Sequence, residues 1–144
     1  MDITSPSFKN NGIIPEKHAC EGENLSPALN FDNVPKAAST LVLIVVDPDA
    51  PCGTFDHWIV WNIPADSKGI EEGQKGLTSG LNSYLVSRYK GPCPPIGSSH
   101  RYFFKLYALD TKLKLPSRVN KKQLMAAMQE HIIDKAELIG IFQR

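Results

Sequence analysis

The stretch TLVLIVVDPDAPCGTFDHWIVWNI, residues 40–63, decides the fold class of this 144-residue chain. Its two apolar runs, 40–46 and 57–63, are hydrophobic at consecutive positions instead of alternating with polar ones. Runs of this kind are typical of strands buried on both faces, as in the middle of a sandwich. The prolines and the glycine between the runs favour a turn. The stretch therefore predicts two buried strands.

A third strand is predicted over HRYFFKLYALD, residues 100–110, because aromatic side chains are enriched in strands. Alternate residues of a strand point to the same face of a sheet. The segment between the second and third strands, residues 65–99, is rich in glycine and ends in GPCPPIG, so we expect mostly loop there. One face of the third strand carries His100, Tyr102, Phe104, Leu106 and Ala108.

Helical periodicity begins only near the end of the chain. Asn120 precedes KKQLMAAMQEHII, and Gln123 stands three residues later, which predicts a capping box and an amphipathic helix. We expect a second short helix over Asp134–Gly140 and a terminal strand at IFQR. The sequence thus predicts a single domain over residues 1–144 that is mainly β, with one or two C-terminal helices.

The composition excludes several classes of protein. The net charge is +1, with 16 basic and 15 acidic residues, so no global field attracts nucleic acid or an anionic membrane. No apolar run reaches the roughly 18 residues needed to span a bilayer. The start, MDITSPSFKN, lacks the basic and apolar regions of a secretory signal, so a cytoplasmic location is expected.

The chain has three cysteines, Cys20, Cys52 and Cys93. An odd number at wide spacing favours reduced thiols over a disulfide framework, and the spacing does not suit a structural zinc site. Cys93, seven residues before His100, has no oxyanion hole or orienting group nearby in the sequence, so we expect a buried, unreactive thiol.

Two catalytic interpretations of the polar residues stay open as alternatives. The acids Asp47 and Asp49 follow a strand, as in aspartyl-phosphate phosphatases, but those enzymes need alternating helices and parallel strands that this sequence lacks. A metal-dependent hydrolase is the stronger alternative, because His57, His100 and Asp47 could form a two-histidine, one-carboxylate face.

An anion-binding pocket fits the same residues best. His57 and His100 can donate hydrogen bonds to phosphate oxygens, and the Tyr102 hydroxyl can add a third. Asp47, and with it Asp49, would accept from the far ring nitrogens and fix the orientation of the imidazoles, with Asp47 serving His57. The GPCPPIG segment would form a stiff wall, because proline fixes φ and lacks an N–H group.

These motifs resemble the phosphatidylethanolamine-binding proteins, the family of the Raf kinase inhibitor proteins. The residues that carry the resemblance are DPDAP followed by DHW, then GPCPP and an HRY strand. HACEGENLSPALNF near the start, ALD after the aromatic strand and MQEHIIDKAELIG near the end extend it over nearly the whole chain. The short chain and GPCPP are most similar to the bacterial and archaeal branch.

The resemblance implies an antiparallel β-sandwich with Greek-key connections and a small anion pocket at one end. It also implies that Arg101 lies on the opposite face in a structural ion pair and that an X-Pro bond is cis, as the family often has. Ligand-binding roles are expected for Asp47, Asp49, Pro51, His57, Pro92, Pro94, His100 and Tyr102.

For function, the resemblance implies a binding and regulatory protein and not an enzyme. We expect a phosphoryl or similar anion as ligand, without cofactor or metal, a kinase or protease as partner, and a homodimer. A third interpretation is a protein–protein inhibitor acting through the long loop 65–91, because long loops without secondary structure are usually functional. The rim of the pocket, residues 80–91, is less glycine-rich than in the family, which leaves the shape of the pocket open.

Overall fold

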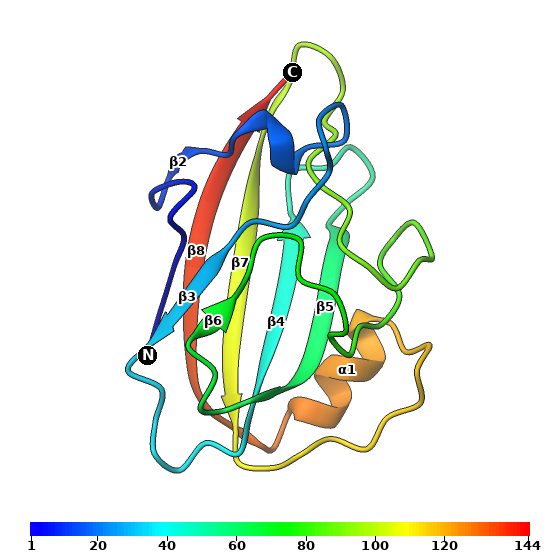
Figure 1. The fold of residues 1–144 in the computed structure, drawn as a ribbon. Helices are drawn as coiled ribbons and strands as arrows, with labels where there is room; N and C mark the ends of the chain where they lie inside the picture. The colour runs from blue at the N-terminus through cyan, green and yellow to red at the C-terminus, as the bar shows by residue number, and fades with distance from the viewer.

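The computed structural model describes residues 1–144 as two β-sheets packed face to face with one α-helix. The large sheet has the strand order β2-β8-β7-β4-β5, and the small sheet has the order β1-β3-β6. Figure 1 shows the small sheet lying over one face of the large sheet. The strands are β1 Asp2–Thr4, β2 Gly12–Ile13, β3 Leu29–Asp32, β4 Thr40–Asp47, β5 Phe55–Pro64, β6 Gly69–Ile70, β7 Ser99–Leu109 and β8 Ile132–Gln143.

The three predicted strands are confirmed as β4, β5 and β7. Every residue of β4 is buried, as its continuous apolar pattern predicts, because both of its faces are covered. The face of β7 predicted from strand parity is buried from end to end, and Tyr102, Phe104 and Leu106 on it are at most 1% exposed. The mainly β sandwich is therefore the observed fold class.

Two hydrophobic clusters cover the two faces of the large sheet. The inner cluster lies between the sheets, where Leu41, Leu43 and Val45 of β4 meet Phe31 of β3. The outer cluster lies under the helix α1, Lys121–Met128. It includes Val42 and Ile44 of β4 together with Leu124 and Met128 of α1. The successive residues of β4 thus alternate between two separate cores.

The helix α1 begins as the sequence predicts. The Asn120 side chain accepts from the Gln123 amide at 3.0 Å, and the Gln123 side chain accepts from the Asn120 amide at 2.9 Å. This reciprocal pair satisfies two amides that the first turn of a helix otherwise leaves without partners. The helix is too short and too polar to cross a membrane, as are all helical segments of the chain.

The prediction of a second helix over Asp134–Gly140 is wrong. These residues belong to β8, which pairs antiparallel with β7 along nearly its whole length. The physical reason is an alternation of period two: Ala136 and Leu138 turn toward the inner cluster, whereas Lys135 and Glu137 are exposed. The terminal strand expected at IFQR therefore begins nine residues earlier, at Ile132.

The prediction of three reduced cysteines is also wrong. Cys20 and Cys93 form a disulfide that joins chain segments 73 residues apart, and only Cys52 is a free, exposed thiol. Sequence spacing carried no signal for this pair, because the fold brings together two loops that are distant in the chain. Disulfides are typical of oxidising compartments and of intracellular proteins of hyperthermophiles.

The disulfide leads to a prediction about stability. Replacing both cysteines, Cys20→Ser with Cys93→Ser, is expected to lower the free energy of unfolding by about 2–5 kcal/mol, because a long closed loop restricts the unfolded chain. Urea unfolding followed by tryptophan fluorescence measures the difference.

Two controls accompany this measurement. A reducing agent should lower the stability of the unmodified protein to that of the double variant and leave the double variant unchanged. Cys52→Ser should have no effect in either condition, since its side chain is exposed and unpaired. Equal urea midpoints for the oxidised protein and the double variant would contradict the prediction.

Candidate functional site

A small cavity lies at the end of the large sheet where β4 ends and where β5 and β7 begin, the upper end in Figure 1. The antiparallel pairing brings these termini together, since Asp47 pairs with Phe55 and Val46 pairs with Phe103. We call it the His57–His100 cavity; its volume is about 210 Å³. It is lined by Asp47, Ala50, Pro51, Phe55, His57, Tyr84, Cys93, Pro94, Pro95, His100 and Tyr102.

A β-bulge turns His57 into this cavity. Val45 pairs with Trp58 but Val46 pairs with Asp56, so His57 has no partner on β4 and forms the extra residue of the bulge. Bulges re-aim side chains and are common beside functional sites. The His57 ring lies edge-on to the Tyr102 ring, with 5.3 Å between the centroids, so the bulge places it on the inner face of the sheet.

The backbone fixes the tautomer of His57. Its Nδ1 lies 2.6 Å from the Lys90 carbonyl oxygen, which can only accept, so Nδ1 carries a proton. Burial lowers the pKa of His57, and this effect outweighs the opposing influence of the Lys90 carbonyl and of Asp47. His57 is therefore neutral near pH 7, with Nε2 as a lone-pair acceptor that becomes a donor on protonation.

Asp47 orients His100, and the prediction that it orients His57 is wrong. Asp47 Oδ2 accepts from His100 Nδ1 at 2.7 Å, and Oδ1 accepts from the Asp49 amide at 2.8 Å. Both side chains are buried, with residue exposures of 3% for Asp47 and 6% for His100. The contact fixes Nδ1 as the protonated nitrogen and leaves Nε2 for other partners.

Asp49 does not orient an imidazole, which corrects the second expectation for the carboxylates. Its two oxygens hold the Arg101 guanidinium at 2.9 and 2.8 Å, and one of them also accepts from the Arg101 amide. The hydrogen bonds from Arg101 lower the pKa of Asp49 to about 2. Asp49 is absent from the cavity lining, and its ion pair fastens the turn after β4 to β7, on the face expected for Arg101.

The Tyr102 hydroxyl is the one uncompensated polar group of the cavity. Tyr102 is 1% exposed, and its hydroxyl has no hydrogen-bond partner. Burial, reinforced by the nearby Asp47 carboxylate, raises the pKa of Tyr102, so the hydroxyl keeps its proton. The Asp47 carboxylate lies near enough to the hydroxyl to raise this pKa, but the contact between them does not meet the geometry of a hydrogen bond. Buried polar groups without partners are rare and point to a missing ligand or water.

The proline-rich wall is built only in part as expected. Pro51 and Pro94 line the cavity, but Pro92 does not; its carbonyl accepts from the Cys20 amide at 3.0 Å. No peptide bond in the chain is cis. The Arg144 guanidinium donates to the Pro94 carbonyl at 3.1 Å and forms an ion pair with Glu21, so the wall is tied to the terminal strand as well as to Cys20.

Three lining residues were missed by sequence reasoning. Phe55 stands two residues before His57, and strand spacing could have indicated it. Tyr84 belongs to a loop and had no signal; its ring packs edge-on against Phe55 with 4.8 Å between the centroids. The third is Ala50, whereas Cys93 and Pro95 belong to the GPCPPIG segment that was expected as a wall.

The metal-site alternative finds little geometric support. The Asp47 oxygens accept from His100 Nδ1 and from a backbone amide. No three His, Cys, Asp or Glu side chains converge in an arrangement suited to a metal ion.

The unpartnered Tyr102 hydroxyl predicts that two matched Tyr→Phe variants change the free energy of unfolding in opposite directions. Tyr102→Phe is expected to raise the free energy of unfolding of the ligand-free protein by up to about 1 kcal/mol, because it removes a buried unsatisfied group. Tyr89→Phe is expected to lower it by about 1 kcal/mol, since the Tyr89 hydroxyl donates to the His18 carbonyl at 2.8 Å. Thermal or urea unfolding without ligand tests both; a loss of stability in Tyr102→Phe as large as in Tyr89→Phe would show that its hydroxyl is satisfied.

Comparison with known proteins places this geometry in a family. The sequence model of the family described as Phosphatidylethanolamine-binding protein matches residues 4–143. A protein of Methanothermobacter thermautotrophicus named UPF0098 is 44% identical over 151 residues, which cover 100% of this chain and 99% of that protein. A UPF0098 protein of Chlamydia pneumoniae is 43% identical, with 100% and 99% covered.

Solved structures agree with the sequence relatives. A crystal structure of a Chlamydia trachomatis protein, described as a homolog of phosphatidylethanolamine-binding protein, is 42% identical, with a TM-score of 0.96 over 99% of this chain and 97% of that one. Escherichia coli YbcL, described as a member of the mammalian family, is 29% identical, with a TM-score of 0.92 over 99% and 98%. The chain therefore belongs to the phosphatidylethanolamine-binding protein family.

Proposed function

We propose that the protein binds a phosphoryl or similar small anionic group in the His57–His100 cavity and does not transform it. Family membership supports a ligand-binding role in general. The finer proposal depends on the polar groups that face the cavity. Their donors and acceptors belong to His57, His100 and Tyr102, with Asp47 as the support of His100.

The observation that carries the proposal is the unpartnered Tyr102 hydroxyl. A protonated hydroxyl in a low-dielectric cavity is a strong donor toward an anionic oxygen. The two imidazoles become donors at Nε2 when they are protonated, and an anion between them stabilises that charged form. The cavity volume of about 210 Å³ suits a small headgroup-sized ligand and not a large one.

Two features support binding over catalysis. Cys93, the only cysteine in the cavity lining, is held in the disulfide with Cys20 and has no thiolate to offer as a nucleophile. The histidine Nδ1 atoms are committed to Lys90 and Asp47, and no three-ligand face for a metal is formed.

A regulatory role toward a kinase or protease is the part of the proposal that depends on the family resemblance alone. The exposed apolar side chains Tyr84 and Leu85, which are 47% and 71% exposed, stand at the rim and are available to a protein partner. A homodimer and a cytoplasmic location stay predictions, and the disulfide makes the location worth measuring directly.

Proton uptake should accompany binding. Burial keeps the pKa of His57 below its ordinary value in the empty cavity, and a bound anion raises it. Affinity is therefore highest below the pKa of the ligand-free state. Between that pKa and the pKa of the bound state it falls by up to about tenfold per pH unit, for one linked proton, and it levels off at higher pH. Sulfate is the suitable probe because its charge is constant between about pH 5.5 and about pH 8.5. Calorimetry in two buffers of different ionisation enthalpy measures both affinity and proton uptake.

A matched pair of variants tests the source of this linkage. His57→Asn keeps a donor for the Lys90 carbonyl but removes Nε2, so it should weaken sulfate binding and flatten its pH dependence. His131→Asn alters a surface histidine paired with Asp110, outside the cavity, and should change neither. Equal sulfate affinity across the pH range in the unmodified protein would refute the proposed role of the imidazoles.

A further inference from the structure

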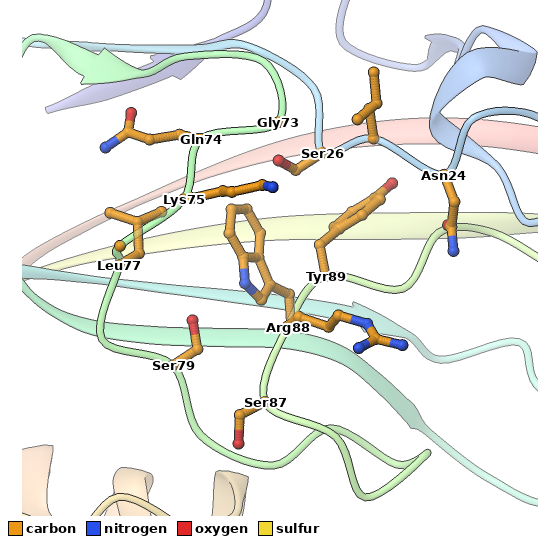
Figure 2. Close-up of a pocket in the computed structure, with 13 residues that line it drawn as sticks. Asn24, Ser26, Gly73, Gln74, Lys75, Leu77, Ser79, Ser87, Arg88 and Tyr89 are labelled. Carbon is orange, nitrogen blue, oxygen red and sulfur yellow. The ribbon is translucent and has the colours of Figure 1, made fainter.

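A second cavity is larger than the first. Its volume is about 390 Å³, within the usual range of small-molecule sites. Three chain segments line it, residues 24–26, 73–79 and 87–89 (Figure 2), together with Trp58 of β5. We call it the Trp58 cavity. It shares no lining residue with the His57–His100 cavity.

The floor of the Trp58 cavity is aromatic. Trp58 and Tyr89 are 2% and 8% exposed, and their rings meet edge to face with 5.5 Å between the centroids. The Tyr89 hydroxyl already donates a hydrogen bond to the His18 carbonyl, so a ligand in the cavity would contact the ring and not the hydroxyl. Since both rings are nearly covered, only a small part of each reaches the cavity, and this apolar surface suits the edge of a planar group.

The charged groups of the lining are of one sign. Lys75 and Arg88 are exposed at the mouth, and none of the thirteen lining residues is Asp or Glu. Neither cation takes part in the ion pairs of the molecule, which use other lysines and arginines. In Figure 2 the Lys75 and Arg88 side chains come from opposite walls. The mouth therefore favours an anion.

Neutral polar residues also line the cavity. Ser26, Ser79 and Ser87 come from the three different segments. Ser26 is only 4% exposed. Such groups can orient the polar part of a ligand without adding charge.

Hydrogen bonds hold the walls in place without a ligand. The Gly73 amide donates to the Ser26 carbonyl at 2.9 Å, which joins the first two segments. The third segment is held by Asn82, whose side chain donates to the Arg88 carbonyl at 2.8 Å. The Asn24 side chain accepts from the Gly91 amide at 2.7 Å and joins the first segment to the third. A preformed site binds with a smaller loss of conformational entropy.

From these observations we infer that the Trp58 cavity is a second binding site, for an organic anion that joins one planar ring to one anionic group. The ring lies against Trp58 and Tyr89, and the anionic group lies between Lys75 and Arg88. Two sources supply this chemistry, an aromatic carboxylate and a nucleoside monophosphate. The site is independent of the proposed function of the His57–His100 cavity.

The two tryptophans make the test specific. Trp58 lies on the floor of this cavity, whereas Trp61 is buried in the outer cluster on the other face of the sheet. In a nitrogen-15-labelled sample, the two indole N–H signals report the two environments separately. Titration with benzoate in one arm and adenosine monophosphate in the other should shift the Trp58 signal and leave the Trp61 signal in place.

Variants and neutral analogues complete the design. Lys75→Gln and Arg88→Gln should each weaken binding by roughly three- to tenfold, as expected for a partly solvated charge-assisted contact. Lys114 is exposed and does not line the cavity, so Lys114→Gln is the matched control and should have no effect. Benzamide and adenosine, which keep the ring but lack the anionic group, should bind more weakly than their charged counterparts.

The outcomes are distinct. A Trp58 shift with either probe that weakens in the Lys75 and Arg88 variants supports the site, and the arm that responds identifies the source. No Trp58 shift with either probe, or a shift that is unchanged when both cations are replaced, overturns it. Shifts confined to His57, His100 and Tyr102 also overturn it, because they place the probe in the first cavity. None of these results depends on whether sulfate binding itself varies with pH.

Discussion

The hydrogen bonding of β7 along both of its edges is the constraint on which the rest of the structure depends. The strand pairs with β4 on one side and with β8 on the other, antiparallel in both cases. Because the pairing is antiparallel, the start of β7 must meet the end of β4, and His100 must arrive beside Asp47. The hydrogen bond between His100 Nδ1 and the Asp47 carboxylate therefore results from the register of the sheet. The His57–His100 cavity depends on the same register.

Much of the fold follows from patterns that the sequence displays openly. The continuous apolar run of β4 indicates a strand with two covered faces, and the parity of β7 indicates which of its side chains face the core. The first part of β8, residues 132–140, escaped prediction because Lys135 and Glu137 lie among residues that also suit a helix. This segment forms a strand because it pairs with the free edge of β7. That partner is distant in the sequence, so no local pattern indicates it. The Cys20–Cys93 pair was missed for the same reason.

The residues of the candidate site could be predicted from the sequence, but their hydrogen-bond partners could not. His57, His100, Tyr102 and Asp47 could be collected from motifs and parity, and all four line one cavity. Which carboxylate serves which imidazole could not be deduced, since it depends on a bulge of one residue in β5 and on the register between β4 and β7. The bulge directs His57 to a backbone carbonyl, whereas the register places Asp47 beside His100 and Asp49 beside Arg101.

The same bulge makes two cavities out of consecutive residues. His57 lines one cavity and Trp58 the other, and the segment that follows Ser87 repeats this division: Arg88 and Tyr89 line the second cavity, while the Lys90 carbonyl holds His57 for the first. Adjacent residues of the same backbone thus contribute to different cavities. A substitution at His57, Trp58 or Tyr89 that shifts this backbone can therefore disturb both cavities, whereas His100 and Lys75 have no neighbour in the chain that lines the other one.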